Sequence, residues 1–293
     1  MTKEIKYEDL IGTFEQKQAI VKEFNLMDDG FFSEVMKDKS ACEYILREIT
    51  GIYDLKVMNV KTQYSIRNLN THSVTLDVLA EDSKSKIYNI EVQKPNNDYH
   101  PKRIRYYQSN IDISYLEKGV KYKNLPDIYL IYITAFDIFK LNDNYYSIKR
   151  TVNGYDKEVP NGIHEIYLNT AVKTNRPITP LMEYFKNTDM NISHFGALSD
   201  RIKQIKHTEE GVNAMSDAVR NFAKKYAADI NADLTLQLKE TEEKMKKEKQ
   251  ILESEKQVLE TQKQSAIEKS EKLIKKMREM GMSDEQIKEI TDN

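Results

Sequence analysis

The sequence predicts an α/β protein in which a mixed sheet is flanked by helices, followed by a long charged C-terminal helix. Two segments that alternate between apolar and polar residues, 72–80 and 86–93, are separated by the polar turn EDSKSK, as in a β-hairpin. The nearly continuous apolar run 127–135 is typical of a central strand that is buried on both faces. Residues 212–280 contain neither glycine nor proline, which favours one long helix or two nearly continuous ones.

The charged residues are concentrated near the C-terminus. They make up 31% of the 293 residues. Residues 239–279 hold 12 Lys or Arg and 10 Asp or Glu, so that 22 of these 41 residues are charged. We therefore expect a core over 1–190, a helical extension over 191–232, a long charged helix over 233–280 and a short terminal helix over 281–293.

The composition excludes several classes of protein. No apolar run approaches the ~20 residues that a membrane helix needs, and the first ten residues lack the apolar core of a secretory leader. The single cysteine, Cys42, allows neither an internal disulfide nor a cysteine zinc cluster, so we expect a cytoplasmic protein. The net charge is −2, so a surface for nucleic acid must be a local patch.

The segment before the first strand, up to about residue 52, is predicted to be mainly helical. Residues 7–27 form a helix or an irregular lead-in. The turn Asp28-Asp29-Gly30 is a cap signal for a helix that begins at Phe31, since Asp accepts hydrogen bonds from free backbone N–H groups. A second helix over 40–49 ends before Gly51, and residues 53–66 contain strand-forming runs.

The elements after the hairpin alternate between helix and strand. Pro101 suits the first turn of a helix and Gly119 suits its end. Residues 163–168 are predicted to form a further strand, and residues 180–187 and 193–230 are predicted to form helices. One face of the helix after Pro101 is apolar at helical spacing and contains Ile104, Tyr107, Ile111 and Tyr115.

The charged extension has one apolar residue in every seven. A coiled coil needs a second apolar position in each heptad, and here that seam is mostly polar. Both a solvated helix and a homodimeric coiled coil therefore remain open. Ser283 and Gln286 form a capping-box pattern for the final helix. The apolar stripe consists of Leu238, Met245, Leu252, Leu259, Ala266, Leu273 and Met280.

The hairpin brings two acidic residues face to face. Centred on its turn, it pairs residues whose numbers sum to 168, so Asp77 faces Glu91. Leu76 and Val92 then share the apolar side, and Gln93 joins the two acids on the other side. Opposed like charges destabilise a sheet, unless a divalent cation lies between them. The alternative is a polar side that faces water, with the acids apart.

Several segments together resemble the recombination-promoting nuclease (Rpn) family, which belongs to the PD-(D/E)XK nuclease superfamily. The resemblance extends over roughly residues 20–230. It implies a restriction-endonuclease-like α/β core and a Mg²⁺- or Mn²⁺-dependent enzyme that acts on DNA. The segments are DDGFF (28–32), TQYSIRNLNTHSVTLDVLAED (62–82), YNIEVQ (88–93), RYYQSNID (105–112) and the run at 125–139.

The resemblance also implies roles for individual residues. Asp77 and Glu91 match the metal-binding acids of two core strands, and the backbone carbonyl of Val92 matches a further ligand. Gln93 stands where the superfamily motif has Lys, and it cannot supply a positive charge. Asp29 matches an acidic position near the first helix, for which Glu34 is a competing candidate.

The helix after the second hairpin strand is the predicted DNA-facing element. Residues 94–123 hold seven basic and three acidic residues, a local excess of 7 − 3 = +4. Neutralising phosphates in this way gives affinity without sequence specificity. The residues expected to contact DNA are Lys94, Lys102, Arg103, Arg105 and Gln108.

The function that we expect from the sequence is hydrolysis of DNA phosphodiesters with Mg²⁺ or Mn²⁺, linked to recombination or transposition. The alternative is a catalytically degenerate protein that binds DNA or partners and assembles through its C-terminal helix. A pure coiled-coil scaffold is disfavoured, because the apolar run at 127–135 requires a buried sheet.

Overall fold

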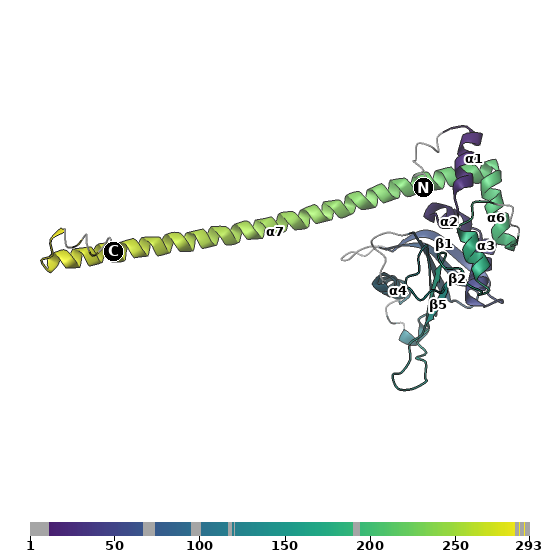
Figure 1. Cartoon of the computed structure of the whole chain (residues 1–293), viewed down its shortest axis with the longest axis horizontal. Helices are drawn as coiled ribbons and strands as arrows, with labels where there is room; N and C mark the ends of the chain where they lie inside the picture. Colours follow the sequence, from purple (N-terminus) through teal and green to yellow (C-terminus); the bar gives the residue numbers. More distant parts are fainter. Residues whose placement is uncertain are drawn as a thin grey trace. The chain divides into compact units, whose positions relative to one another are not determined.

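The structure is a computed structural model, and it describes residues 12–66, 74–94, 101–116, 119, 121–189, 194–284, 287 and 290. The chain divides into two compact units, residues 1–224 and residues 225–293 (Figure 1). None of the helices in the described ranges is both long and apolar enough to cross a membrane.

Three helices precede the sheet: α1 (Phe14–Glu23), α2 (Asp29–Met36) and α3 (Lys39–Thr50). The helix predicted to begin at Phe31 begins two residues earlier, at Asp29. Asp28 stands at its N-cap but makes no capping bond there, because its carboxylate accepts the backbone N–H of Asn25 instead. Gly51 ends α3 with a left-handed backbone (φ 71°), as predicted.

The sheet has six strands in the order β1-β2-β3-β4-β6-β5. β3 and β4, and β4 and β6, pair parallel, and the other neighbours pair antiparallel, so the sheet is mixed as predicted. The short strand β5 was not predicted. The strands are β1 (Val57–Ile66), β2 (Val74–Asp82), β3 (Ile87–Gln93), β4 (Ile128–Thr134), β5 (Tyr145–Ile148) and β6 (Ile163–Asn169).

Both faces of the sheet are covered. One face packs on a large core formed with α2, α3, α5 (Thr179–Phe185) and α6 (Gly196–His207). The other face packs on a smaller core under α4 (Pro101–Tyr115), which connects the parallel strands β3 and β4. A short 3₁₀ helix, η2 (Tyr122–Asn124), precedes β4. β3 and β4 are buried along their whole length, as expected of parallel strands between two helical layers.

The predicted hairpin register is confirmed. The face of the sheet on which alternate β2 side chains lie, however, switches at Asp77. Val78 pairs with Ile90, so the residue numbers sum to 168. Val78 faces the large core, whereas Leu76 packs in the smaller core under α4. The prediction that Leu76 shares a side with Val92 is therefore wrong.

The cause of this switch lies in both β1 and β2. From Asn59 to Ile66, the numbers of paired β1 and β2 residues sum to 140 on both sides of Asp77, but Gln63 and Asp77 themselves do not pair. Gln63 has a left-handed backbone (φ 49°), which is uncommon for a residue with a side chain. At this irregularity, the Asp77 side chain does not follow the alternation of β2 side chains between the two faces of the sheet.

The predicted helix over 193–230 is broken at Thr208, which separates α6 from α7 (Glu209–Glu279). The Thr208 hydroxyl accepts the N–H of Gly211 and so caps α7. A Cβ on Gly211 would lie 2.5 Å from the Gln204 carbonyl oxygen, so only glycine fits this crossing. Within the first unit, α6 and the first turns of α7 contribute to the large core through Leu198, Ile202, Ile205, Val212 and Met215.

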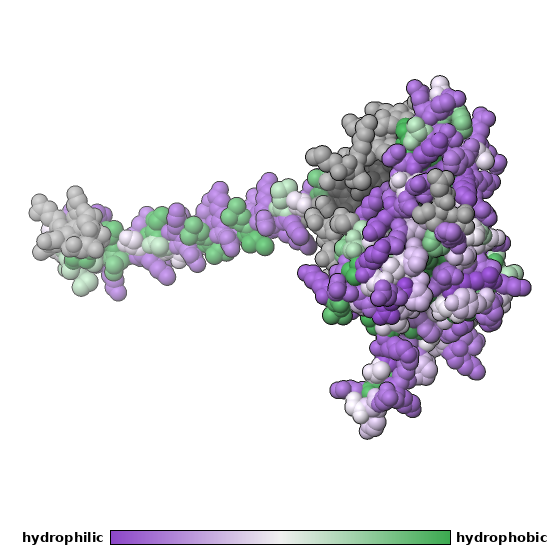
Figure 2. All heavy atoms as spheres, turned by 45° about the vertical axis from the view of Figure 1, so that its right-hand side comes forward, coloured by the Kyte–Doolittle hydropathy of each residue, from purple (hydrophilic) through white to green (hydrophobic). Residues whose placement is uncertain are grey.

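The second unit contains most of α7, and its apolar stripe is exposed. Figure 2 shows hydrophobic side chains recurring along this helix among hydrophilic ones. Leu252 is 67% exposed and Leu259 is 53% exposed. In the predicted terminal helix, the Ile287 N–H donates a hydrogen bond to the Ser283 carbonyl. Gln286, the other residue of the predicted capping box, lies outside the described residues.

Candidate active site

Asp77 and Glu91 meet where β2 and β3 stop pairing through their backbones. The last paired residues are Val78 and Ile90. Beyond them the Asp77 N–H donates to Glu91 Oε1 at 3.2 Å, and the Val92 N–H donates to Asp77 Oδ2 at 3.0 Å. Each carboxylate thus takes the place of a backbone acceptor on the facing strand, which holds the two acidic side chains side by side.

Glu91 is the more buried of the two acids. Its side chain is 2% exposed, and its second oxygen, Oε2, has no hydrogen-bond partner among the described residues. Burial, followed by the charge of Asp77, raises the pKa of Glu91 well above its usual value. A buried carboxylate oxygen without a partner is costly unless a proton or a cation satisfies it.

Asp77 is held from the opposite side by β1. The Gln63 amide nitrogen donates to Asp77 Oδ1 at 3.4 Å and to the Ser33 hydroxyl of α2 at 3.0 Å. Burial, followed by the charge of Asp29, raises the pKa of Asp77. Gln63 was not anticipated from the sequence, because its contact depends on its unusual backbone conformation.

Of the two candidate acids in α2, Asp29 is the one whose charge acts on Asp77. Asp29 lies at the start of α2, where burial raises its pKa to about 6 and its charge reaches Asp77. Glu34 is one turn further along and pairs with Lys37 and Arg201 at 2.5 and 3.4 Å. These ion pairs give Glu34 a structural role.

Val92 and Gln93 complete the end of β3. The Gln93 carbonyl accepts the N–H of Ala135, on the β4 side, while the Val92 N–H points to Asp77. Because the N–H and C=O of a strand residue point to the same neighbour, the Val92 carbonyl faces β2 as well. The Gln93 side chain is only 8% exposed, and its Oε1 accepts a bond from Arg103 at 3.4 Å.

The predicted DNA-facing residues separate into two groups. Arg103 lies at the site, whereas Lys102 and Arg105 are exposed on α4. Lys94 forms an ion pair with Asp28. Gln108 donates to Asp112 at 3.3 Å along the helix and does not join the acids.

The residues present fit a divalent cation of the magnesium type. Among the described side chains, no group of three or more His, Cys, Asp or Glu is placed to hold a metal ion. Asp77 and Glu91 would therefore supply two carboxylates, and the unpartnered Oε2 of Glu91 is the strongest indication of such a ligand. Mg²⁺ is commonly held by one or two carboxylates, with waters and phosphate oxygens as its other ligands.

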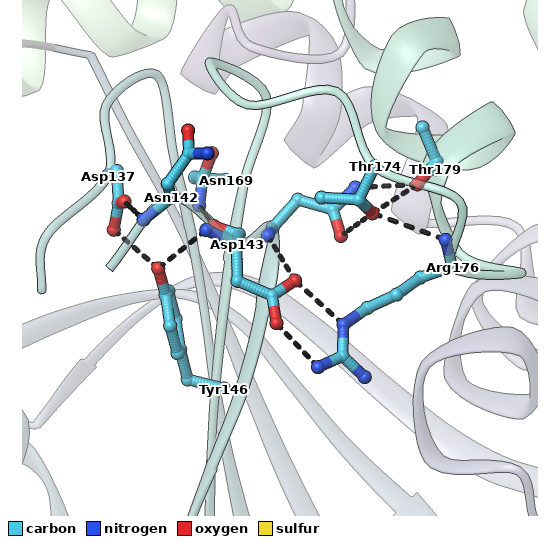
Figure 3. A network of polar contacts seen from close by, with 9 residues as sticks. Asp137, Asn142, Asp143, Tyr146, Asn169, Thr174, Arg176 and Thr179 are labelled. Carbon is cyan, nitrogen blue, oxygen red and sulfur yellow. Dashed lines mark hydrogen bonds and ion pairs between the residues drawn. The ribbon is translucent and has the colours of Figure 1, made fainter. Parts of the chain in front are cut away.

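A second polar cluster belongs to the loops after β4 and β6 (Figure 3). Arg176 donates to both oxygens of Asp143, and these bonds lower the pKa of Asp143. Asp137 accepts the Tyr146 hydroxyl at 2.8 Å and the Asn142 N–H at 2.8 Å. Since its carboxylates are already paired within the loops, we interpret this cluster as a structural brace.

The mixed sheet between two helical layers, with the two acids on its neighbouring strands β2 and β3, defines a restriction-endonuclease-like α/β fold. The model of the family described as "PD-(D/E)XK nuclease family transposase" matches residues 15–176, more than half of the chain. The chain belongs to this family. No curated protein matches the chain.

Proposed function

We propose that the protein is a metal-dependent endonuclease that hydrolyses DNA phosphodiester bonds. The observation that carries this proposal is the convergence of Asp77 and Glu91, with one buried Glu91 oxygen that has no hydrogen-bond partner in the described part of the chain. A structural pair of acids would be expected to form direct ion pairs with the protein, as Glu34 does, whereas neither Asp77 nor Glu91 forms one with the described residues.

In this proposal, some residues hold the metal ion and others bind the DNA. Asp77, Glu91 and the Val92 carbonyl would hold Mg²⁺ or Mn²⁺, and the ion would lower the pKa of a bound water and offset charge on the phosphate. Asp29 adds a third acid close to this position. Lys102 and Arg105, exposed on α4, would bind the DNA backbone without reading its sequence.

The biological setting is also part of the proposal. The family description supports a role in transposition, and we extend the proposal to recombination. The single cysteine is compatible with a cytoplasmic location. The exposed stripe of the C-terminal helix would pair two copies of the chain as a homodimer.

A second candidate is a DNA-binding protein in which catalysis has been lost. The observation that favours it is Gln93, whose amide provides no charge where the superfamily motif has a lysine. This candidate predicts DNA binding without cleavage.

The test is conversion of supercoiled plasmid to nicked or linear DNA with Mg²⁺ or Mn²⁺. The wild type should cleave, and a chelator should abolish cleavage. Asp77→Asn and Glu91→Gln should each reduce the rate at least ~10²-fold, because each removes a ligand charge at the reacting centre. Glu81→Gln, an acid on β2 beyond the site, is the matched control and should cleave like the wild type. Binding without cleavage by the wild type would favour the second candidate.

A further inference from the structure

The candidate site is strongly acidic near the position where a phosphate must bind. The charge of Asp29 acts on Asp77, and the charge of Asp77 acts on Glu91. A phosphodiester approaching them is repelled unless cations offset the charge. Gln93 cannot contribute, since an amide is neutral at every accessible pH. A protein cation that assists the metal ion at this site must therefore come from another element.

Arg103 of α4 lies where such a cation is needed. Its Nη1 donates to Gln93 Oε1 at 3.4 Å, so the guanidinium is next to the side chain that replaces the motif lysine. Its charge lowers the pKa of Asp29, Asp77 and Glu91, although burial outweighs this effect at each acid. Arg103 thus interacts with every acid of the site.

Tyr107 holds this guanidinium in place. Arg103 Nε donates to the Tyr107 hydroxyl at 2.7 Å, and the guanidinium carbon lies 5.2 Å from the centre of the tyrosine ring. Tyr107 is 7% exposed and packs in the core under α4. These two bonds use two of the five N–H donors of the guanidinium.

We propose that Arg103 is a catalytic residue that binds the scissile phosphate and supplies the charge that Gln93 lacks. This inference rests on the proposed nuclease function. It changes the role expected from the sequence, in which Arg103 was one of several residues contacting the DNA backbone. Lys94 is less suited to the role, because it is exposed and paired with Asp28.

The chemical step defines what Arg103 can do. The oxygen of a water molecule forms a bond to phosphorus and loses a proton to solvent. The bond from phosphorus to one sugar oxygen breaks, and that oxygen leaves with the electron pair and takes up a proton from solvent. Negative charge grows on the non-bridging oxygens, where a fixed guanidinium stabilises it. Arg103 transfers no proton, since a guanidinium stays protonated at every accessible pH.

The experiment compares single-turnover cleavage of one plasmid substrate by Arg103 variants. Arg103→Gln should lose ~10²–10³-fold in rate at saturating protein, as expected for one transition-state donor. Arg103→Lys keeps the charge but lacks the planar fork, so its rate should lie between those of the wild type and Arg103→Gln. Arg150→Gln, an exposed arginine after β5, is the matched control.

A second experiment places a positive charge on β3, at the position where the superfamily motif has lysine. Adding Gln93→Lys to Arg103→Gln should raise the rate at least ~10-fold above that of Arg103→Gln alone, since a lysine there restores a cation beside the acids. Mn²⁺ affinity, measured by calorimetry without DNA, should be unchanged or tighter in Arg103→Gln, because a repelling charge has been removed.

The outcomes separate the inference from the proposed function. Equal cleavage by the wild type and Arg103→Gln would overturn the inference and leave the nuclease function intact. Loss of cleavage together with loss of Mn²⁺ binding would show that Arg103 only maintains the structure. Failure of Gln93→Lys to raise the rate would also contradict the inference. A wild type that binds Mn²⁺ but never cleaves would overturn both proposals.

Discussion

Lys206 shows how a single buried residue connects distant parts of the first unit. Its side chain is fully buried, and its ammonium group donates to the backbone carbonyls of Lys22, Phe24 and Thr188. It also lies 5.1 Å from the centre of the Phe31 ring in α2. These bonds connect α6 to the end of α1 and to the chain after α5, and so stabilise the layer that supports Asp29.

Lys206→Met should destabilise the protein and change how its stability depends on pH. At neutral pH the variant should lose ~1–3 kcal/mol, because buried carbonyls lose their donor. Burial lowers the pKa of Lys206 from its ordinary 10.5 to about 8. Between pH 8 and pH 10.5 the unfolded wild type therefore binds more protons than the folded protein. The contribution of Lys206 to the free energy of unfolding rises with pH over this range.

Urea unfolding at pH 7, 8, 9 and 10 tests this expectation. The difference in unfolding free energy between wild type and Lys206→Met should widen above pH 8. Lys203→Met, on the same helix but only partly buried, is the matched control and should leave both the stability and its pH dependence close to those of the wild type. A constant or narrowing difference would contradict the account of Lys206.

At the residue scale, the sequence predicted only those site residues whose position follows from the alternation pattern of a neighbouring segment. The register that brings Asp77 opposite Glu91 follows from the alternation of two neighbouring strands, because slipping by one residue would reverse their faces. The contacts of Gln63 and Arg103 could not be foreseen, since they depend on a left-handed backbone and on where α4 packs.

At the scale of elements, the predictions succeeded where a segment has one dominant period. The buried strand β4 and the hairpin of β2 and β3 were found in this way. The strand β5 was missed because it has only four residues, none of them buried. The break at Thr208 was missed because a threonine between two helices is only a weak signal, although its hydroxyl caps α7.

The exposed stripe on α7 carries a prediction of its own. If it pairs two copies, the double variant Leu252→Glu, Leu259→Glu should be monomeric while the wild type is dimeric, because each change places charge in the apolar seam. The control is Gln250→Glu, Gln257→Glu, which adds the same charge two residues before each position and should remain dimeric. Light scattering measures the state, and a monomeric wild type would exclude the coiled coil.

At the scale of the whole molecule, the two compact units have different kinds of surface. The first unit buries two cores around a mixed sheet and presents its acids where β2 and β3 separate. The second unit exposes its apolar residues along one helix. We therefore propose that catalysis belongs to the first unit and assembly to the second.

The account depends most on whether Asp77 and Glu91 hold a divalent cation. Thermal unfolding of wild type, Asp77→Asn and Glu81→Gln, each with chelator and with Mg²⁺, tests this directly. Asp77→Asn should fold, because the Asn carbonyl oxygen can still accept the Val92 N–H. In chelator its stability should match or slightly exceed that of the wild type, because the substitution removes a repulsion worth ~0.2–1 kcal/mol. Mg²⁺ at tenfold its Kd should stabilise wild type and Glu81→Gln by ~1.4 kcal/mol, and Asp77→Asn by much less. An equal Mg²⁺ shift in all three proteins, or none in any, would contradict the central claim.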